Sequence, residues 1–122
     1  MDKLGLGRKY EAIVMRRWEW HGFKCWQPAR AKYATQDIFG LFDFIAVKPY
    51  CPVNLVQVKR LRRSECEKAL DAIKAFADQY NAPVAPFLVT WKAYDARTSF
   101  QAWQYGLTGW FNAGEWNDAG NP

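Results

Sequence analysis

Two short strand-like runs, separated by a segment with two prolines, constrain the fold of this chain more than any other feature. The runs cover Phe42–Lys48 and Asn54–Arg60, and the segment between them reads Pro49-Tyr50-Cys51-Pro52. Because proline donates no backbone hydrogen bond, such a segment is unsuited to the middle of a sheet. The pattern therefore predicts an antiparallel hairpin whose loop contains both prolines.

Polar side chains occur on both strands of the predicted hairpin. Side chains alternate across a strand, so sequence parity assigns each of them to a face. Leu55, Gln57 and Lys59 share one face of the second strand, and Asp43 shares a face of the first strand with Ile45. Burying such groups without partners costs several kcal/mol. Either they satisfy one another in a dry core, or they line the floor of a working cleft, which is the interpretation we favour.

A helix is expected before the hairpin, over Leu4–His21. Apolar residues recur at helical spacing along it, and Gly22 is a natural C-terminal stop. Glu11 lies one position from the apolar stripe, so we expect it near the edge of the buried face. The alternative is an ordinary surface glutamate that pairs with Arg8 or with the neighbours of Met15. His21 is interpreted as a helix-end residue, where a cation is mildly stabilised, and not as a ligand or base.

A second helix is expected after the hairpin, over Ser64–Tyr80. Its apolar residues repeat at three- and four-residue steps, which is typical of a helix packed on a sheet. The start of this segment matches a capping box, with Ser64 as the N-cap and Glu67 three positions later.

Three more strands are expected, over Phe23–Gln27, Val84–Trp91 and Ser99–Tyr105. Pro86 implies an edge or irregular position for the second of these. Strands interrupted by one long helix predict a single-domain α/β fold, in which helices cover the faces of a mixed sheet. Residues 106–122 carry several aromatic side chains among Gly, Asn and Asp, and we expect a loosely ordered tail or a segment docked on a partner chain.

Bulk properties narrow the class of protein further. The formal net charge of +5 favours a polyanionic partner, of which nucleic acid is the commonest. No apolar run approaches the roughly 18 to 20 residues that a transmembrane helix needs. The N-terminus has no signal-peptide pattern, so we expect a cytoplasmic protein. Three widely spaced cysteines without a CxxC pair argue against a disulfide framework and against structural zinc.

The order of polar residues resembles the PD-(D/E)XK nuclease superfamily, and within it the archaeal-type Holliday junction resolvases and related phage nucleases. The chain offers Glu11 in the first helix, Asp43 entering a strand, and Gln57-Val58-Lys59 on the next strand. Phe42 replaces the proline of the motif, and glutamine replaces its second acid, a QxK variation that is known in the superfamily. The resemblance covers about residues 5 to 105 and implies a restriction-endonuclease-like αβββαβ core within a domain of residues 1–105.

The resemblance also implies a metal-dependent DNA endonuclease that uses Mg²⁺, with Mn²⁺ able to substitute. Asp43 would be the direct carboxylate ligand, joined by the side-chain carbonyl of Gln57 and the backbone carbonyl of Val58. Glu11 would reach the ion through a water. Lys59 would orient the attacking water and stabilise charge on the phosphate, with a pKa that burial could lower for proton transfer. Loss of one acid predicts weaker Mg²⁺ binding and better activity with Mn²⁺.

The remaining polar residues are assigned to the DNA interface or left open. Asp37, in the loop before the hairpin, either caps a turn or adds a second acid to the site. The residues expected to contact phosphate are Arg8, Lys9, Arg30, Lys32, Arg60, Arg62 and Arg63. The partner is expected to be branched or otherwise structured DNA, as in recombination and repair, bound by a homodimer.

Three alternatives remain open at this point. Asp43 and Lys59 could pair in a purely structural cluster that Gln57 bridges. The chain could be a nucleic-acid-binding module with a degenerate nuclease site. It could also be a structural subunit whose aromatic surface binds another protein.

Overall fold

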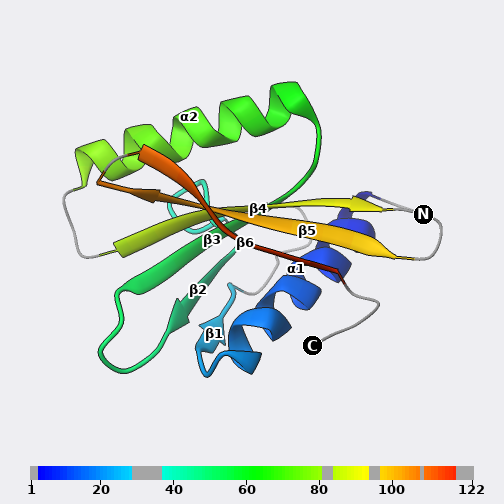
Figure 1. The fold of residues 1–122 in the computed structure, drawn as a ribbon, viewed down its shortest axis with the longest axis horizontal. Coiled ribbons are helices and arrows are strands. Elements are labelled where there is room, and N and C mark those ends of the chain that lie inside the picture. Colours follow the sequence, from blue (N-terminus) through cyan, green and yellow to red (C-terminus); the bar gives the residue numbers. More distant parts are fainter. Residues whose placement is uncertain (1–2, 29–36, 81–83, 94–96, 108, 118–122) are drawn as a thin grey trace.

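A six-stranded mixed sheet with one long helix on each face forms the molecule (Figure 1). The structure is a computed structural model that describes residues 3–28, 37–80, 84–93, 97–107 and 109–117, with the side chains of residues 3–7 left out. The elements are α1 (Lys3–Trp20), β1 (Lys24–Trp26), β2 (Phe44–Val47), β3 (Val53–Arg60), α2 (Arg63–Gln79), β4 (Val84–Ala93), β5 (Thr98–Gly106) and β6 (Gly109–Asn117).

The strands lie in the sheet in the same order as in the sequence. β1, β2 and β3 form an antiparallel meander, so the predicted hairpin is confirmed. α2 then crosses over the sheet and returns the chain to β4, which pairs parallel with β3. β5 and β6 add two antiparallel strands beyond β4. The predicted α/β class, with helices flanking a mixed sheet, is therefore confirmed. No helix in the described ranges is long and apolar enough to cross a membrane.

α1 ends just before Gly22, the residue that was predicted to stop the helix. Gly22 adopts a φ of 93°, which a side chain would disfavour. Its N–H donates to the Glu19 carbonyl at 2.9 Å, and the Phe23 N–H donates to the Trp18 carbonyl at 3.1 Å. These two bonds form a Schellman motif. They turn the chain directly from α1 into β1.

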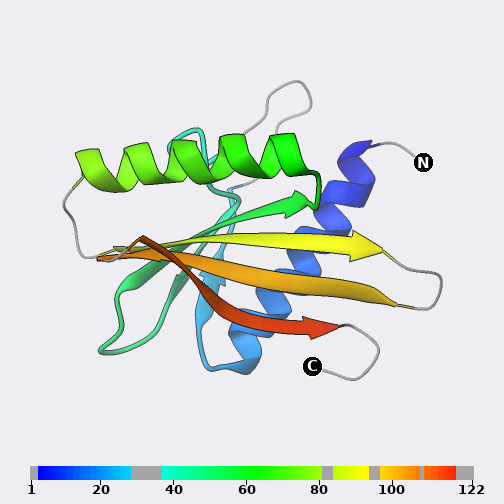
Figure 2. The same cartoon turned by 45° about the horizontal axis from the view of Figure 1, so that its top comes forward.

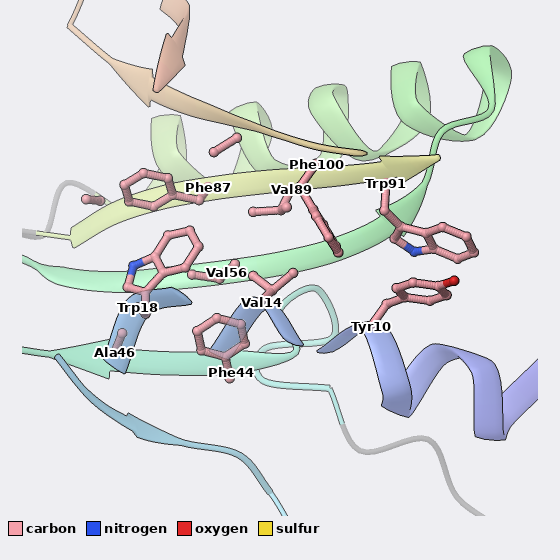
Figure 3. Close-up of a cluster of buried hydrophobic side chains, with 12 residues drawn as sticks. Tyr10, Val14, Trp18, Phe44, Ala46, Val56, Phe87, Val89, Trp91 and Phe100 are labelled. Carbon is pink, nitrogen blue, oxygen red and sulfur yellow. The ribbon is translucent and has the colours of Figure 1, made fainter. Parts of the chain in front are cut away.

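The face of the sheet toward α1 carries the larger apolar cluster. Figure 3 shows it between α1 and the strands, with Tyr10, Val14 and Trp18 from the helix. Fully buried strand residues opposite them include Phe44, Val56 and Val89. The even-numbered residues of β3 therefore face α1.

The face toward α2 carries a second apolar cluster, in which Leu55 of β3 packs with Ala69 and Ile73 of the helix. α1 and α2 thus lie on opposite sides of the sheet, as Figure 2 shows. Because side chains alternate along a strand, Gln57 and Lys59 share the α2 face with Leu55. This is the arrangement that parity predicted.

The predicted capping box of α2 is wrong. The N-cap is Arg62, in an extended conformation and without a side-chain capping bond, so Ser64 lies inside the helix. Glu67 interacts with Arg63, whose Nε donates to its carboxylate at 3.3 Å. The helix starts earlier than predicted because the extended backbone of β3 ends at Arg60, leaving only two residues for the turn into α2.

Pro86 does not place β4 at an edge of the sheet, since β4 lies between β3 and β5. Pro86 pairs with Leu55 of β3, and the pairing with β5 begins one residue later, at Phe87 opposite Gln104. The proline lies just outside the β4–β5 ladder, where its missing N–H removes no bond to β5.

The chain after Gly106 is not the loose tail that we expected. Residues 109–117 form β6, which pairs with β5 from Gly106 opposite Gly109 to Ser99 opposite Asn117. The Trp116 ring stacks on Phe100 at 5.2 Å between centroids, so packing on β5 outweighs the weak strand propensity of this segment. Residues 118–122 lie outside the described ranges.

Candidate functional site

Asp43 lies in a bend immediately before β2, at the margin of β3. Its backbone N–H donates to the Val56 carbonyl at 2.8 Å. Its carboxylate oxygen Oδ2 accepts a hydrogen bond from the Val58 N–H at 2.7 Å. The side chain therefore occupies the position along β3 at which β2 no longer supplies a backbone partner, and the half-buried carboxylate is fixed there.

Gln57 precedes Val58 on β3 and carries a buried polar atom without a partner in the described chain. Its Oε1 atom is buried, and no hydrogen-bond partner for it is present within the described residues. An unsatisfied buried acceptor costs about 1–3 kcal/mol. Such an atom in a folded protein is explained by a functional role or by a water or ion that completes its bonding.

Lys59 follows on the same face of β3, half-buried and opposite Thr90 of β4. It forms no ion pair with any residue that the structure describes. The structural cluster considered above requires Lys59 paired with Asp43 and Gln57 bridging the two. The carboxylate of Asp43 instead bonds the Val58 N–H, and the Gln57 oxygen bridges nothing.

Glu11 is buried on α1, with 6% of its surface exposed, so the alternative of a surface glutamate paired with Arg8 is wrong. Its carboxylate accepts a short hydrogen bond from Nε2 of Gln27, the residue after β1. Because Trp26 pairs with Ile45, Gln27 lies level with Phe44, next to Asp43. Glu11 therefore lies at the same end of the sheet as Asp43, on the side of α1.

Gln27 is the residue of this site that sequence analysis missed. It ends a predicted strand just before Pro28 and stands alone in no recognisable motif. Only the position of α1 against the end of β1 brings its amide to Glu11. A glutamine that ends a strand predicts no such contact.

Asp37 is exposed and begins a turn. Its backbone carbonyl accepts a hydrogen bond from the Gly40 N–H at 3.2 Å, and Phe42 then bonds back to Ile38. This agrees with the turn role considered for Asp37. Its role as a second acid stays a prediction.

The basic run after β3 lies on the surface. The Arg60 guanidinium lies 5.7 Å from the centroid of the Trp91 ring. Arg62 and Arg63 form exposed ion pairs with Glu65 and Glu67 of α2, at 4.0 and 3.3 Å. Exposed pairs of this kind contribute about 0–1 kcal/mol, so a phosphate can replace the glutamates at small cost.

The other predicted phosphate contacts are less defined. Arg8 and Lys9 are exposed on α1, and the Lys9 ammonium lies 5.6 Å from the Tyr10 ring. Arg30 and Lys32 lie outside the described ranges.

No family model matches the chain, and comparisons with curated proteins and with solved structures found no match. The geometry of the site is thus the basis on which a function can be assigned.

The donor atoms at this end of the sheet suit a hard divalent cation. Asp43 and Gln57 offer oxygen atoms. The carboxylate of Glu11 lies at the same end of the sheet but on the α1 face, across the sheet from Gln57 and Lys59. Among the described residues, no group of three or more His, Cys, Asp or Glu side chains could hold a metal. A site with so few protein ligands fits Mg²⁺, which retains several of its waters, and Mn²⁺ accepts similar oxygen ligands.

His21 and the cysteines play no part in this site. His21 is exposed at the end of α1, and partial burial, Arg17 and Lys48 lower its pKa, so the stabilised cation that we expected is not favoured. All three cysteines are free thiols. Burial, and then the charge of Glu19, raise the pKa of Cys25 to about 11.

Proposed function

We propose that this protein is a Mg²⁺- or Mn²⁺-dependent DNA endonuclease with a restriction-endonuclease-like αβββαβ core. One observation carries the proposal. The Asp43 carboxylate is held on the Val58 N–H, and the preceding residue on β3, Gln57, carries a buried oxygen that lacks a partner within the described residues. The element order α1, β1, β2, β3, α2 and β4 in a mixed sheet also supports it, because the resemblance to PD-(D/E)XK nucleases implies an αβββαβ core.

Each residue of the site has a defined task in this proposal. A divalent cation bound here would acidify a water and neutralise charge on the phosphate. Asp43 and Gln57 would hold the ion through oxygen atoms, with Glu11 acting through a water. The Lys59 ammonium, which has no ion-pair partner among the described residues, would stabilise charge that develops on the phosphate.

The substrate we propose is branched or otherwise structured DNA, bound by a homodimer in the cytoplasm. The net charge of +5 and the exposed Arg60, Arg62 and Arg63 near the end of β3 support a polyanionic partner. Contacts of these side chains to phosphate would be independent of base sequence.

Cleavage assays test the proposal directly. Four-way junctions, flaps, single strands and linear duplexes are incubated with Mg²⁺ or Mn²⁺, and the products are separated by electrophoresis. We expect Asp43→Asn and Lys59→Gln to lower the cleavage rate at least about 100-fold.

Matched controls for these two variants lie on α2. Asp71→Asn and Lys68→Gln make the same chemical changes at exposed positions, so we expect the wild-type rate. Two results would rule out this nuclease site: an Asp43→Asn protein that still cleaves DNA, or a wild-type protein that cleaves none with either metal.

A nucleic-acid-binding module with a degenerate site is the second candidate. Two observations favour it. No group of three or more His, Cys, Asp or Glu side chains among the described residues could hold a metal, and Gln57 stands where the motif has an acid. Gln57→Glu distinguishes the two. In a nuclease weakened by this glutamine, the added charge strengthens Mg²⁺ binding, which calorimetry measures, and raises the cleavage rate in Mg²⁺. DNA binding without cutting by both proteins would favour the binding module.

A further inference from the structure

A row of polar residues crosses the sheet from the candidate lysine to the far edge. In the pairing register Lys59 lies opposite Thr90, Thr90 opposite Gln101, and Gln101 opposite Glu115. Leu55 and Leu88, which share the parity of Lys59 and Thr90 on their strands, pack toward α2. The whole row therefore lies on the α2 face of the sheet.

The row forms part of a cavity of about 370 Å³. In Figures 1 and 2 the ends of β4 and β5 project past the first turn of α2, so the helix leaves this part of the face uncovered. The polar residues that line the cavity are Thr90, Lys92, Ser99, Gln101, Glu115 and Asn117. This volume lies within the range typical of small-ligand sites.

Three of these lining residues have unused hydrogen-bonding groups. Within the described part of the chain, the side chains of Thr90, Ser99 and Gln101 form no hydrogen bond, although Thr90 is only 4% exposed. None of their polar atoms is buried without a partner among the described residues, so these groups reach the open cavity, where water can bond them. Their side chains are thus placed to bond a ligand in the cavity.

The chemistry of the lining favours a neutral heterocycle over a phosphate. Gln101 supplies a donor and an acceptor on one amide, which matches the donor–acceptor edge of a nucleobase. Glu115, which accepts a bond from Asn112 at 3.4 Å, would repel a second phosphate. Trp91 and Trp116 border the cavity, but their rings pack in the apolar cluster on the α1 face, so the polar side chains of the row supply the contacts.

We propose that this cavity receives one unpaired nucleobase next to the phosphate held at Lys59, with Gln101 and Thr90 bonding its edge. This proposal rests on the proposed function, because Lys59 is taken to mark the phosphate. Neighbouring strands are about 4.8 Å apart, so the row places the cavity one to two strand spacings from Lys59. A base stacked inside a duplex cannot enter such a cavity, so the site selects unpaired nucleotides.

Binding assays without divalent metal test the cavity separately from cleavage. The probes are a 12-nucleotide single strand and the same strand with abasic residues throughout, each titrated in EDTA by fluorescence anisotropy. We expect Gln101→Leu to weaken binding of the normal strand about 3- to 10-fold and to leave the abasic strand unchanged. Ser99→Ala provides a second, smaller change in the same direction.

Gln104→Leu is the matched control, because Gln104 lies on the same strand but lines a different cavity on the α1 face. It should change neither affinity, and thermal melting verifies that each variant folds. Equal losses for both strands in Gln101→Leu, or no loss for either, would overturn the nucleobase site. If Gln101→Leu discriminates between the strands while no DNA is cut in Mg²⁺ or Mn²⁺, the cavity stands and the nuclease proposal fails.

Discussion

At the scale of single residues, Gln57 carries a buried polar atom that should cost the fold stability. Its buried Oε1 has no partner within the described residues, so replacing the amide with an apolar side chain of similar volume should stabilise the fold. We expect Gln57→Met to raise the free energy of unfolding by about 1 kcal/mol, and to raise the Tm by about 3–5 °C. Calorimetry or thermal circular dichroism without metal provides the measurement.

The control for this change is Gln79→Met, at an exposed position in the last turn of α2. It should change the free energy of unfolding by less than about 0.5 kcal/mol. A Gln57→Met protein that melts lower than the wild type would show that the amide is satisfied in solution, and the argument for a ligand at its oxygen would fail.

His21 provides a second prediction at this scale, because it is the only histidine in the chain. Burial, Arg17 and Lys48 lower its pKa, so the folded protein binds fewer protons there than the unfolded chain. The stability from this group is fully present above the unfolded value of about 6.5 and is lost as pH falls through the lower folded pKa.

Proton NMR should therefore show one histidine titrating with a midpoint below 6.5. Lys48→Met removes one of the two cations and should move that midpoint upward, while Lys24→Met, on the neighbouring strand, should leave it in place. A wild-type midpoint at or above the usual value would contradict the interpretation.

Parity and hydrophobic spacing predicted which residues face which way, but not which side chains meet. Alternation along β3 correctly placed Gln57 and Lys59 on one face, because a strand has a fixed period of two. The bonds from Gln27 to Glu11 and from Val58 to Asp43 depend on the docking of α1 and on where β2 begins. Those tertiary relations leave no periodic signal in the sequence.

At the scale of elements, the turn from α1 into β1 determines where the helix crosses the sheet. The Schellman bonds at Gly22 require its φ of 93°, a region that disfavours residues with a Cβ. Gly22→Ala should therefore lower the free energy of unfolding by about 1–2 kcal/mol. Urea unfolding monitored by circular dichroism measures this loss. An unchanged midpoint would mean that the turn can adopt another conformation without moving α1.

Elements with strong periodicity were predicted well, and their ends were not. The apolar period of α2 predicted the burial of Cys66, Ala69 and Ile73, but the helix begins at Arg63 because the chain leaves β3 abruptly. β6 was missed because its Gly- and Asn-rich sequence has low strand propensity. Its partner strand β5 supplies the hydrogen bonds that make it a strand.

At the scale of the whole molecule, the parallel crossover brings the candidate site, the cavity and the basic run to one end of the sheet. Because α2 links β3 to β4 and these strands run parallel, their C-terminal ends lie together near the start of α2. Asp43 at the margin of β3, the cavity at the end of β4 and the basic run at Arg60–Arg63 therefore share one end of the molecule. This convergence follows from topology, which sequence periodicity alone does not specify.

The salt dependence of DNA binding tests whether this end of the molecule is the phosphate interface. Each phosphate contact that is removed should reduce the slope of log K against log [salt] by about 0.7–0.9. We expect the double variant Arg62→Gln, Arg63→Gln to reduce the slope by about 1.5, measured by anisotropy in EDTA between about 50 and 200 mM salt. Arg16→Gln, at an exposed position on α1, should leave the slope unchanged. Equal slopes for the wild type and the double variant would place the phosphates elsewhere. The substitutions themselves remove only exposed, weak ion pairs with Glu65 and Glu67, so the fold should not change.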